Sequence, residues 1–170
     1  MAAAIPPNPA PTISTRTGCC PLLVTSLSPV SASYVREDGY SVSTDPECVD
    51  LDVVWGFLRQ SYWSPGIERD VVAAGIENSI PFSLLDPAGN QAGFARVVTD
   101  RTRFAWLADV FVLAAHRGRG LGVWLVETVV THPDLEALSI VLATADAHGL
   151  YERFGFRAVD VTRMMERRAT

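Results

Sequence analysis

The feature that most constrains this chain is a basic, glycine-rich turn that follows an apolar run. Residues 110–122 read Val-Phe-Val-Leu-Ala-Ala-His-Arg-Gly-Arg-Gly-Leu-Gly. Glycines at alternate positions allow positive φ angles and a close approach of the backbone to a ligand. If a helix starts at this turn, its first amide hydrogens have no intrahelical partners and point toward one spot. Arg117 and Arg119 add charge suited to phosphate, so the turn is predicted to bind an anion.

Two common phosphate-binding loops do not match this turn. A Walker A loop requires Lys-Ser or Lys-Thr after its last glycine, and neither dipeptide follows here. The dinucleotide fingerprint has the spacing G-x-G-x-x-G, whereas Gly118, Gly120 and Gly122 follow the spacing G-x-G-x-G. A purely structural alternative is a turn that permits tight strand-to-helix packing without a ligand.

The composition fits one acidic domain. The chain has 170 residues, 48% of them hydrophobic, and a formal net charge of −5. This length and apolar content suit one compact domain. Because nucleic-acid-binding modules present a strongly basic face, we expect no nucleic-acid partner. An acidic surface is compatible with cationic or amine substrates.

The cysteines and the hydropathy pattern bear on the cellular compartment, on metal binding and on membrane insertion. Cys19, Cys20 and Cys48 are too few and too badly spaced for a disulfide framework or a zinc site. No apolar run reaches the roughly 18 residues of a membrane span. We therefore expect a cytoplasmic protein with no metal site and no membrane partner.

The N-terminal segment differs in composition from the rest of the chain. Residues 1–32 hold six of the eleven prolines and one charged side chain, Arg16. Such a Pro-, Ser- and Ala-rich segment cannot bury enough apolar area to offset the entropy lost on ordering. We expect residues 1–36 to form a disordered tail and residues 37–170 to form the domain. An extension upstream of the native start is an alternative origin for the tail.

The order of predicted elements indicates an α+β fold (mixed α/β). Alternating apolar and polar residues predict strands, whereas apolar residues at spacings of three and four predict helices. A strand, the glycine turn, a helix and another strand form a crossover that supplies a parallel strand pair. The predicted strands are 40–44, 81–86, 91–98, 103–113, 138–143 and one or two within 156–165, and the predicted helices are 50–58 with Asp50 as its cap, 67–78, one from the glycine turn to His132-Pro133, and 148–154.

A second motif makes a family resemblance specific. The turn Arg117-Gly-Arg-Gly-Leu-Gly122 resembles the R/Q-x-x-G-x-G/A signature of the GNAT superfamily of acyl-CoA-dependent N-acetyltransferases. Further along, Leu150-Tyr-Glu-Arg-Phe-Gly-Phe156 is similar to the superfamily's LY-x-x-x-GF mark. The resemblance covers roughly residues 39–168. It implies a GNAT-like fold, in which a central, mostly antiparallel mixed sheet with a splayed parallel strand pair is flanked by about four helices.

The resemblance implies acetyl-CoA as the co-substrate and a set of residues that bind it. The turn amides would wrap the pyrophosphate, and the exposed backbone of the preceding strand would bind the pantetheine arm and polarise the thioester carbonyl. In many members of the superfamily an asparagine contacts the pantetheine at the position where this chain has Thr144. His148 would lie near the thiol end of the cofactor. The candidate cofactor-binding residues are Val110, Phe111, Val112, Arg117, Gly118, Arg119, Gly120, Leu121, Gly122, Thr144 and His148.

The candidate catalytic residues are Tyr151 and Asp109. The resemblance implies that the motif tyrosine, Tyr151, acts as the general acid that reprotonates the departing thiolate, and the alternative is an aromatic that only packs the helix. Asp109 is an acid inside an otherwise apolar strand and is the candidate base, because a buried carboxylate needs a partner or a purpose. The alternative for Asp109 is a structural acid bonded to backbone or to Arg96.

The predicted function is transfer of an acetyl group from acetyl-CoA to a primary amine by direct attack in a ternary complex. No cysteine lies near either motif, so no covalent intermediate is expected. Tyr62 and Trp63 could form an acceptor wall for a cationic small-molecule or peptide amine, or could be core. The alternative function is a non-catalytic acyl-CoA-binding or regulatory module. The assembly is expected to be a monomer or a homodimer.

Overall fold

The structure is a computed structural model that describes residues 31–160, 162 and 164–167. The predicted disordered tail therefore falls mostly outside the described residues and stays a prediction. Its last part does not, because strand β1 (Ser33–Val35) lies ahead of the predicted domain start at residue 37. In the part of the chain that is described, no helix is long and apolar enough to cross a bilayer.

The described residues form a six-stranded sheet with the strands in sequence order. Strands β1 to β5 pair with antiparallel neighbours, whereas β5 and β6 are parallel. This arrangement confirms the predicted mixed sheet with one parallel pair. The remaining strands are β2 (Ser41–Ser43), β3 (Ile80–Leu85), β4 (Gln91–Thr99), β5 (Phe104–Val112) and β6 (Ser139–Val141).

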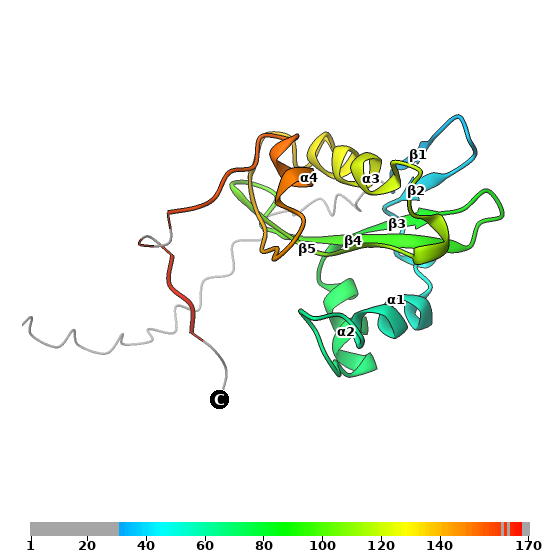
Figure 1. Ribbon diagram of the computed structural model, residues 1–170, viewed down its shortest axis with the longest axis horizontal. Helices are drawn as coiled ribbons and strands as arrows, with labels where there is room; N and C mark the ends of the chain where they lie inside the picture. Colours follow the sequence, from blue (N-terminus) through cyan, green and yellow to red (C-terminus); the bar gives the residue numbers. More distant parts are fainter. Residues whose placement is uncertain (1–30, 161, 163, 168–170) are drawn as a thin grey trace, which may run out of the picture. The chain divides into compact units, whose positions relative to one another are not determined.

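Four helices of the described chain cover the two faces of the sheet. In Figure 1, α1 and α2 lie against one face, and α3 and α4 lie against the other. Asp50 caps α1 as predicted, because its Oδ1 accepts hydrogen bonds from the amides of Asp52 and Val53. The helices are α1 (Leu51–Leu58), α2 (Arg69–Glu77), α3 (Leu121–Val130) and α4 (His148–Glu152).

Two hydrophobic clusters hold these layers together. On the α1–α2 side, Val54 and Leu58 lie one helical turn apart and pack with Phe94 and Phe111 of the sheet. The α3–α4 side has a larger cluster that draws on alternate sheet residues such as Ala95. Neighbouring residues Phe94 and Ala95 of β4 therefore face opposite clusters, so this strand joins the two halves of the core.

The predicted strands within residues 156–165 are wrong for the described residues of that segment. Past Gly155 the described chain forms no strand. Phe156 still packs against the core, but the apolar side chains farther along find no cover, because Val159, Met164 and Met165 are 51%, 52% and 99% exposed. Beyond Phe156 the described segment therefore buries too little apolar surface to offset the entropy of ordering a further strand.

Candidate active site

The glycine-rich turn leads directly into α3, as its sequence predicted. Gly118 and Gly120 have φ angles of 78° and 72°, which favour glycine. Gly120 is the N-cap of α3, and no side chain accepts a hydrogen bond from the first helical amides. These amides and the exposed Arg119 beside them suit a phosphate group. The turn therefore presents the free amides and the charge that an anion-binding turn needs.

The strand before the turn offers only part of its backbone. The Val112 carbonyl accepts a 2.9 Å hydrogen bond from Nε of Arg117, so this carbonyl is engaged within the protein. The Phe111 side chain points to the opposite side, where its ring stacks on Phe57 at 3.9 Å between centroids. Val110 lines the cavity described next. Of these three candidate residues, Val110 is best placed to meet a ligand.

A cavity opens where the two parallel strands part. The pairing of β5 with β6 ends at Trp106 and Val141, whereas β5 continues to Val112. Beyond the last pair, residues 106–110 and residues 142–144 line one cavity of about 340 Å³. The predicted splay of the parallel pair is therefore present, and it creates the space that the site occupies.

Asp109 sits on a bulge that projects its side chain into this cavity. The β4–β5 register shifts between Phe94 and Arg96, and the φ angle of Asp109 is 55°. One carboxylate oxygen pairs with Nε of Arg96, and the other accepts a 3.3 Å hydrogen bond from Nε1 of Trp63. The side chain is 10% exposed. Asp109 therefore has the Arg96 partner that a structural acid would have, and it also faces the cavity.

Tyr151 of α4 lines the same cavity as Asp109. It is 8% exposed. Burial raises the pKa of its phenol to about 12, with smaller contributions from Tyr62 and Asp146. The phenol therefore carries its proton throughout the neutral range. Its ring also packs edge-on against Phe156, so the motif tyrosine both packs the core and faces the site.

The two remaining candidate residues differ in position. Thr144 lines the cavity, but its Oγ1 accepts a hydrogen bond from the amide of Ala147 at the start of α4. His148 lines an adjoining cavity and not the one that holds Asp109. Asp146, near His148 in sequence, lines the main cavity beside Tyr151. The cofactor roles of Thr144 and His148 stay predictions.

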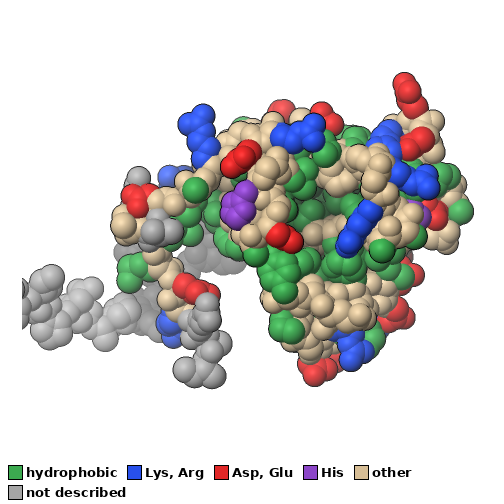
Figure 2. Space-filling view, in the orientation of Figure 1, with side chains coloured by type: hydrophobic (Ala, Val, Ile, Leu, Met, Phe, Trp, Pro, Cys, Tyr) green, Lys and Arg blue, Asp and Glu red, His purple; other side chains and the backbone are tan. Residues whose placement is uncertain are grey.

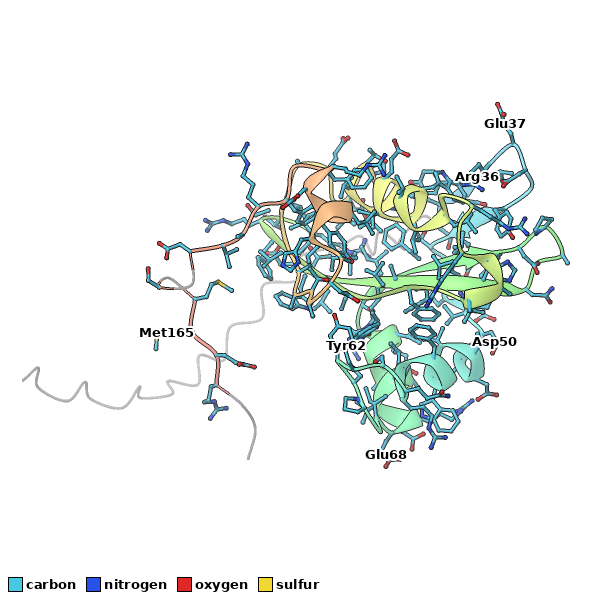
Figure 3. The ribbon with its side chains drawn as sticks, viewed as in Figure 1. Arg36, Glu37, Asp50, Tyr62, Glu68 and Met165 are labelled. Carbon is cyan, nitrogen blue, oxygen red and sulfur yellow. The ribbon has the colours of Figure 1, made fainter. Side chains whose placement is uncertain are left out.

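The connection between α1 and α2 crosses the cavity. Tyr62 and Trp63 are 58% and 40% exposed, so they are wall residues and not core. The Oη of Tyr62 accepts a 3.1 Å hydrogen bond from the amide of Ala145, and Trp63 donates to Asp109. This pair of side chains therefore bridges the two sides of the cavity. Figure 3 shows Tyr62 at the end of the helical layer that faces the sheet.

The charges around the cavity give it a negative balance. Arg96 contributes one positive charge, and Asp109 and Asp146 contribute one negative charge each. Figure 2 shows apolar side chains gathered between the two layers on one face of the molecule, with acidic and basic side chains at the border. In the described part of the chain, no group of three or more His, Cys, Asp or Glu side chains is placed to hold a metal ion.

One residue and one contact of the site lie outside what the sequence predicts. Arg36, assigned to the tail, donates a hydrogen bond to the carbonyl of Arg119 in the glycine turn. Tyr62 was proposed for the acceptor wall, but its bond to Ala145 was not foreseen. Each of these bonds joins residues 83 positions apart, so no local pattern could reveal it.

Comparisons with known proteins indicate the family of this chain. A family model described as "Acetyltransferase (GNAT) domain" matches residues 78–158. The crystal structure of a protein from Xanthomonas campestris, described as a putative acetyltransferase of the GNAT family, is 41% identical; the match covers 76% of this chain and 93% of that one, with a TM-score of 0.73.

Two further matches are more distant. A curated protein of Gibberella zeae, named as a putative acetyltransferase, is 27% identical over 114 residues, which cover 56% of this chain and 64% of that protein. This chain thus spans less than two thirds of that relative. A Clostridium acetobutylicum structure described as a "predicted acetyltransferase with acetyl-CoA" is 12% identical, with 76% and 94% of the two chains covered and a TM-score of 0.56, and it shares the fold. On these matches, together with the turn, the splay and the motif tyrosine, the chain belongs to the GNAT family of acetyltransferases.

Proposed function

We propose that this protein transfers an acetyl group from acetyl-CoA to a primary amine of a small molecule or peptide, by direct attack in a ternary complex. One observation carries the proposal: a single cavity at the splay brings Asp109 and Tyr151 together beside the strand that leads to the glycine turn. Membership of the GNAT family supports acyl transfer. The Clostridium structure with acetyl-CoA supports the choice of donor.

The glycine turn and the open edge of β5 would hold acetyl-CoA, which supplies an acyl group activated as a thioester. The uncapped amides at the start of α3 would bind the pyrophosphate, and Arg119 would add charge. Beyond Trp106, none of the described strands pairs with β5 on its β6 side, so the backbone near Val110 has hydrogen-bonding groups to offer. Residues of this chain thus orient the donor along the cavity wall.

Asp109 would bind the amine of the acceptor. Its carboxylate faces the cavity, and the lining side chains carry one more negative than positive charge, which favours a single ammonium group. The nitrogen must lose a proton before it can attack, and Asp109 Oδ1 is the proposed place where that proton is held, directly or through a water. The rings of Tyr62 and Trp63 would add attraction for a cation.

Tyr151 would hold the proton that the leaving sulfur needs. Because its pKa is raised to about 12, Oη stays protonated and donates a hydrogen bond where negative charge develops. A thiol has an ordinary pKa near 8.5, so full proton transfer from this phenol is uphill. We therefore propose that Tyr151 acts first as a hydrogen-bond donor and completes the transfer only as the sulfur departs.

The test is release of CoA thiol with a panel of primary amines. The chain contains no lysine, so its own side-chain amines cannot serve as acceptors and add no background. We expect amine-dependent release by the wild type and a loss of about 10²- to 10⁴-fold in Tyr151→Phe. Tyr34→Phe is the matched control, because Tyr34 packs against His132 and does not line the cavity.

The same experiment distinguishes the alternative function. The Arg96–Asp109 ion pair favours a non-catalytic acyl-CoA-binding module, since it gives this carboxylate a structural partner without any acceptor. CoA binding without amine-dependent release would support that module. A wild-type protein that does not bind CoA would overturn both functions.

A further inference from the structure

We propose that Arg36 is a positioning residue that fixes the geometry of the glycine turn. It lies in the β1–β2 hairpin, far from both family motifs in sequence. Figure 3 shows Arg36 beside the end of α3 that the turn leads into. The proposal rests on the proposed function only for the identity of the ligand, acyl-CoA.

The Arg36 guanidinium is held in one orientation by its contacts. Its Nε and Nη2 donate to the two carboxylate oxygens of Asp38, which makes a two-pronged pair. Its Cζ lies 5.7 Å from the ring centroid of Tyr40 and 5.5 Å from that of Trp124. Nη1 is then directed at the Arg119 carbonyl, to which it donates a 3.1 Å hydrogen bond.

That last bond determines where a turn amide points. The described peptide bonds are all trans, so the carbonyl of Arg119 and the amide hydrogen of Gly120 lie on opposite sides of their shared peptide plane. Holding the carbonyl toward Arg36 therefore turns the Gly120 amide away from Arg36. Gly120 is also the uncapped N-cap of α3, where an anion would bind. Without Arg36, a glycine at φ 72° has wide freedom to rotate this peptide.

The β1–β2 hairpin is held in place by its own hydrogen bonds and by contacts with the chain around the glycine turn. The amide of Arg36 donates to the Tyr40 carbonyl at 2.8 Å, which closes the hairpin. The buried Tyr40 side chain forms a 2.8 Å hydrogen bond between its Oη and Nδ1 of His116, just before the turn. The hairpin thus contacts the chain before the turn through Tyr40 and within it through Arg36.

Simple charge attraction is the competing role for Arg36. The carboxylate of Asp38 neutralises the guanidinium through the two-pronged contact. A neutralised pair contributes little long-range attraction to a phosphate. Arg36→Lys separates the two roles, because lysine keeps the charge but cannot reproduce the planar, two-pronged contact.

The experiment measures CoA binding by calorimetry and the order parameters of the turn amides by ¹⁵N relaxation, with the full chain. Arg36→Met should weaken CoA binding on the order of tenfold, which corresponds to about 1.4 kcal/mol. In the ligand-free protein the order parameters of residues 118–121 should fall from about 0.85 toward 0.6. Arg101→Met, which breaks the exposed pair with Asp134 away from the turn, should leave both quantities unchanged. Arg36→Lys should resemble Arg36→Met, with a smaller effect.

Each outcome decides the proposal. Wild-type CoA affinity and unchanged order parameters in Arg36→Met would overturn it, as would an Arg36→Lys variant that matches the wild type in both measurements. A wild type that does not bind CoA would refute the proposed function, whereas the relaxation data on the free protein would still test the positioning role. A thermal melt checks that each variant is folded.

Discussion

Replacing Asp109 by Asn tests the role of this carboxylate most directly. One of its oxygens pairs with Arg96, and the other faces the cavity beside Trp63. Asparagine keeps the size of the side chain and one accepting oxygen, and it tolerates a left-handed backbone at φ 55°. The substitution therefore removes the negative charge with little change in shape.

The burial of the Arg96–Asp109 pair sets the expected loss of stability. The two side chains are 24% and 10% exposed. Breaking a fully buried pair costs about 3–5 kcal/mol, whereas an exposed pair contributes about 0–1 kcal/mol. Arg96 retains some contact with solvent, and the amide oxygen of asparagine still accepts from its Nε. We expect the free energy of unfolding of Asp109→Asn to fall by about 1–3 kcal/mol.

The expected loss of activity is larger than stability alone explains. A positioned proton acceptor contributes about 10²- to 10⁴-fold in rate, which is about 2.7–5.5 kcal/mol of barrier. The assay is CoA release with the best amine of the panel, followed between about pH 6 and pH 9 on protein shown to be folded. Urea unfolding, monitored by tryptophan fluorescence, gives the stability change separately.

Asp52→Asn is the matched control. Asp52 accepts a 2.8 Å bond from Nε of Arg69, but its side chain is 74% exposed. We expect a stability change below about 1 kcal/mol and unchanged turnover. If Asp109→Asn loses stability but keeps the wild-type rate and pH profile, the carboxylate is structural and the proton goes elsewhere.

Three further predictions follow from other contacts. Tyr62→Phe removes the hydroxyl that accepts a hydrogen bond from the Ala145 amide. Steady-state kinetics should show a several-fold change in KM for the amine and an unchanged KM for acetyl-CoA. Folding raises the pKa of Tyr151 from an ordinary 10.0 to about 12, so its protonated phenol stabilises the folded state. This contribution is fully present below about pH 10 and is lost as the pH rises through about 12. Urea unfolding across this pH range should therefore show a smaller loss of stability in Tyr151→Phe than in the wild type. Gly93→Ala would place Cβ 2.6 Å from a backbone oxygen of β5 and should lower the free energy of unfolding by about 1–3 kcal/mol in urea. Gly56→Ala lies inside α1 with nothing within 4 Å of the new Cβ, so it should raise the free energy of unfolding by up to about 1 kcal/mol. Equal effects of the two substitutions would contradict the packing.

Local signals in the sequence predict the helices and most strands within a few residues. Asp50 marks the start of α1 because a cap depends only on the next few amides. The glycines fix the start of α3 for the same reason, since their positive φ angles are local. Periodicity is likewise local, so it locates β4 and β5 well.

Features that depend on the partner strand or on distant loops lie beyond such signals. The bulge at Asp109 arises from the register between β4 and β5, and nothing in the residues of β5 alone specifies it. The bonds from Arg36 to the turn and from Ala145 to Tyr62 join distant segments. The missing strand after Gly155 shows the converse, because apolar residues predict a strand only where another surface covers them.

The short contact between β5 and β6 gives the two walls of the cavity unequal stiffness. Only three residue pairs join these strands, from Phe104–Ser139 to Trp106–Val141, whereas the antiparallel contact of β4 with β5 runs the length of both strands. Local opening therefore costs less free energy at β6 than in the centre of the sheet. A bulky acceptor would enter by moving residues 142–147 outward, while Asp109 stays fixed on the stiffer wall. The softer β6 side would thus determine how large an acceptor can enter, and the stiffer β5 side would keep Asp109 in position for proton transfer.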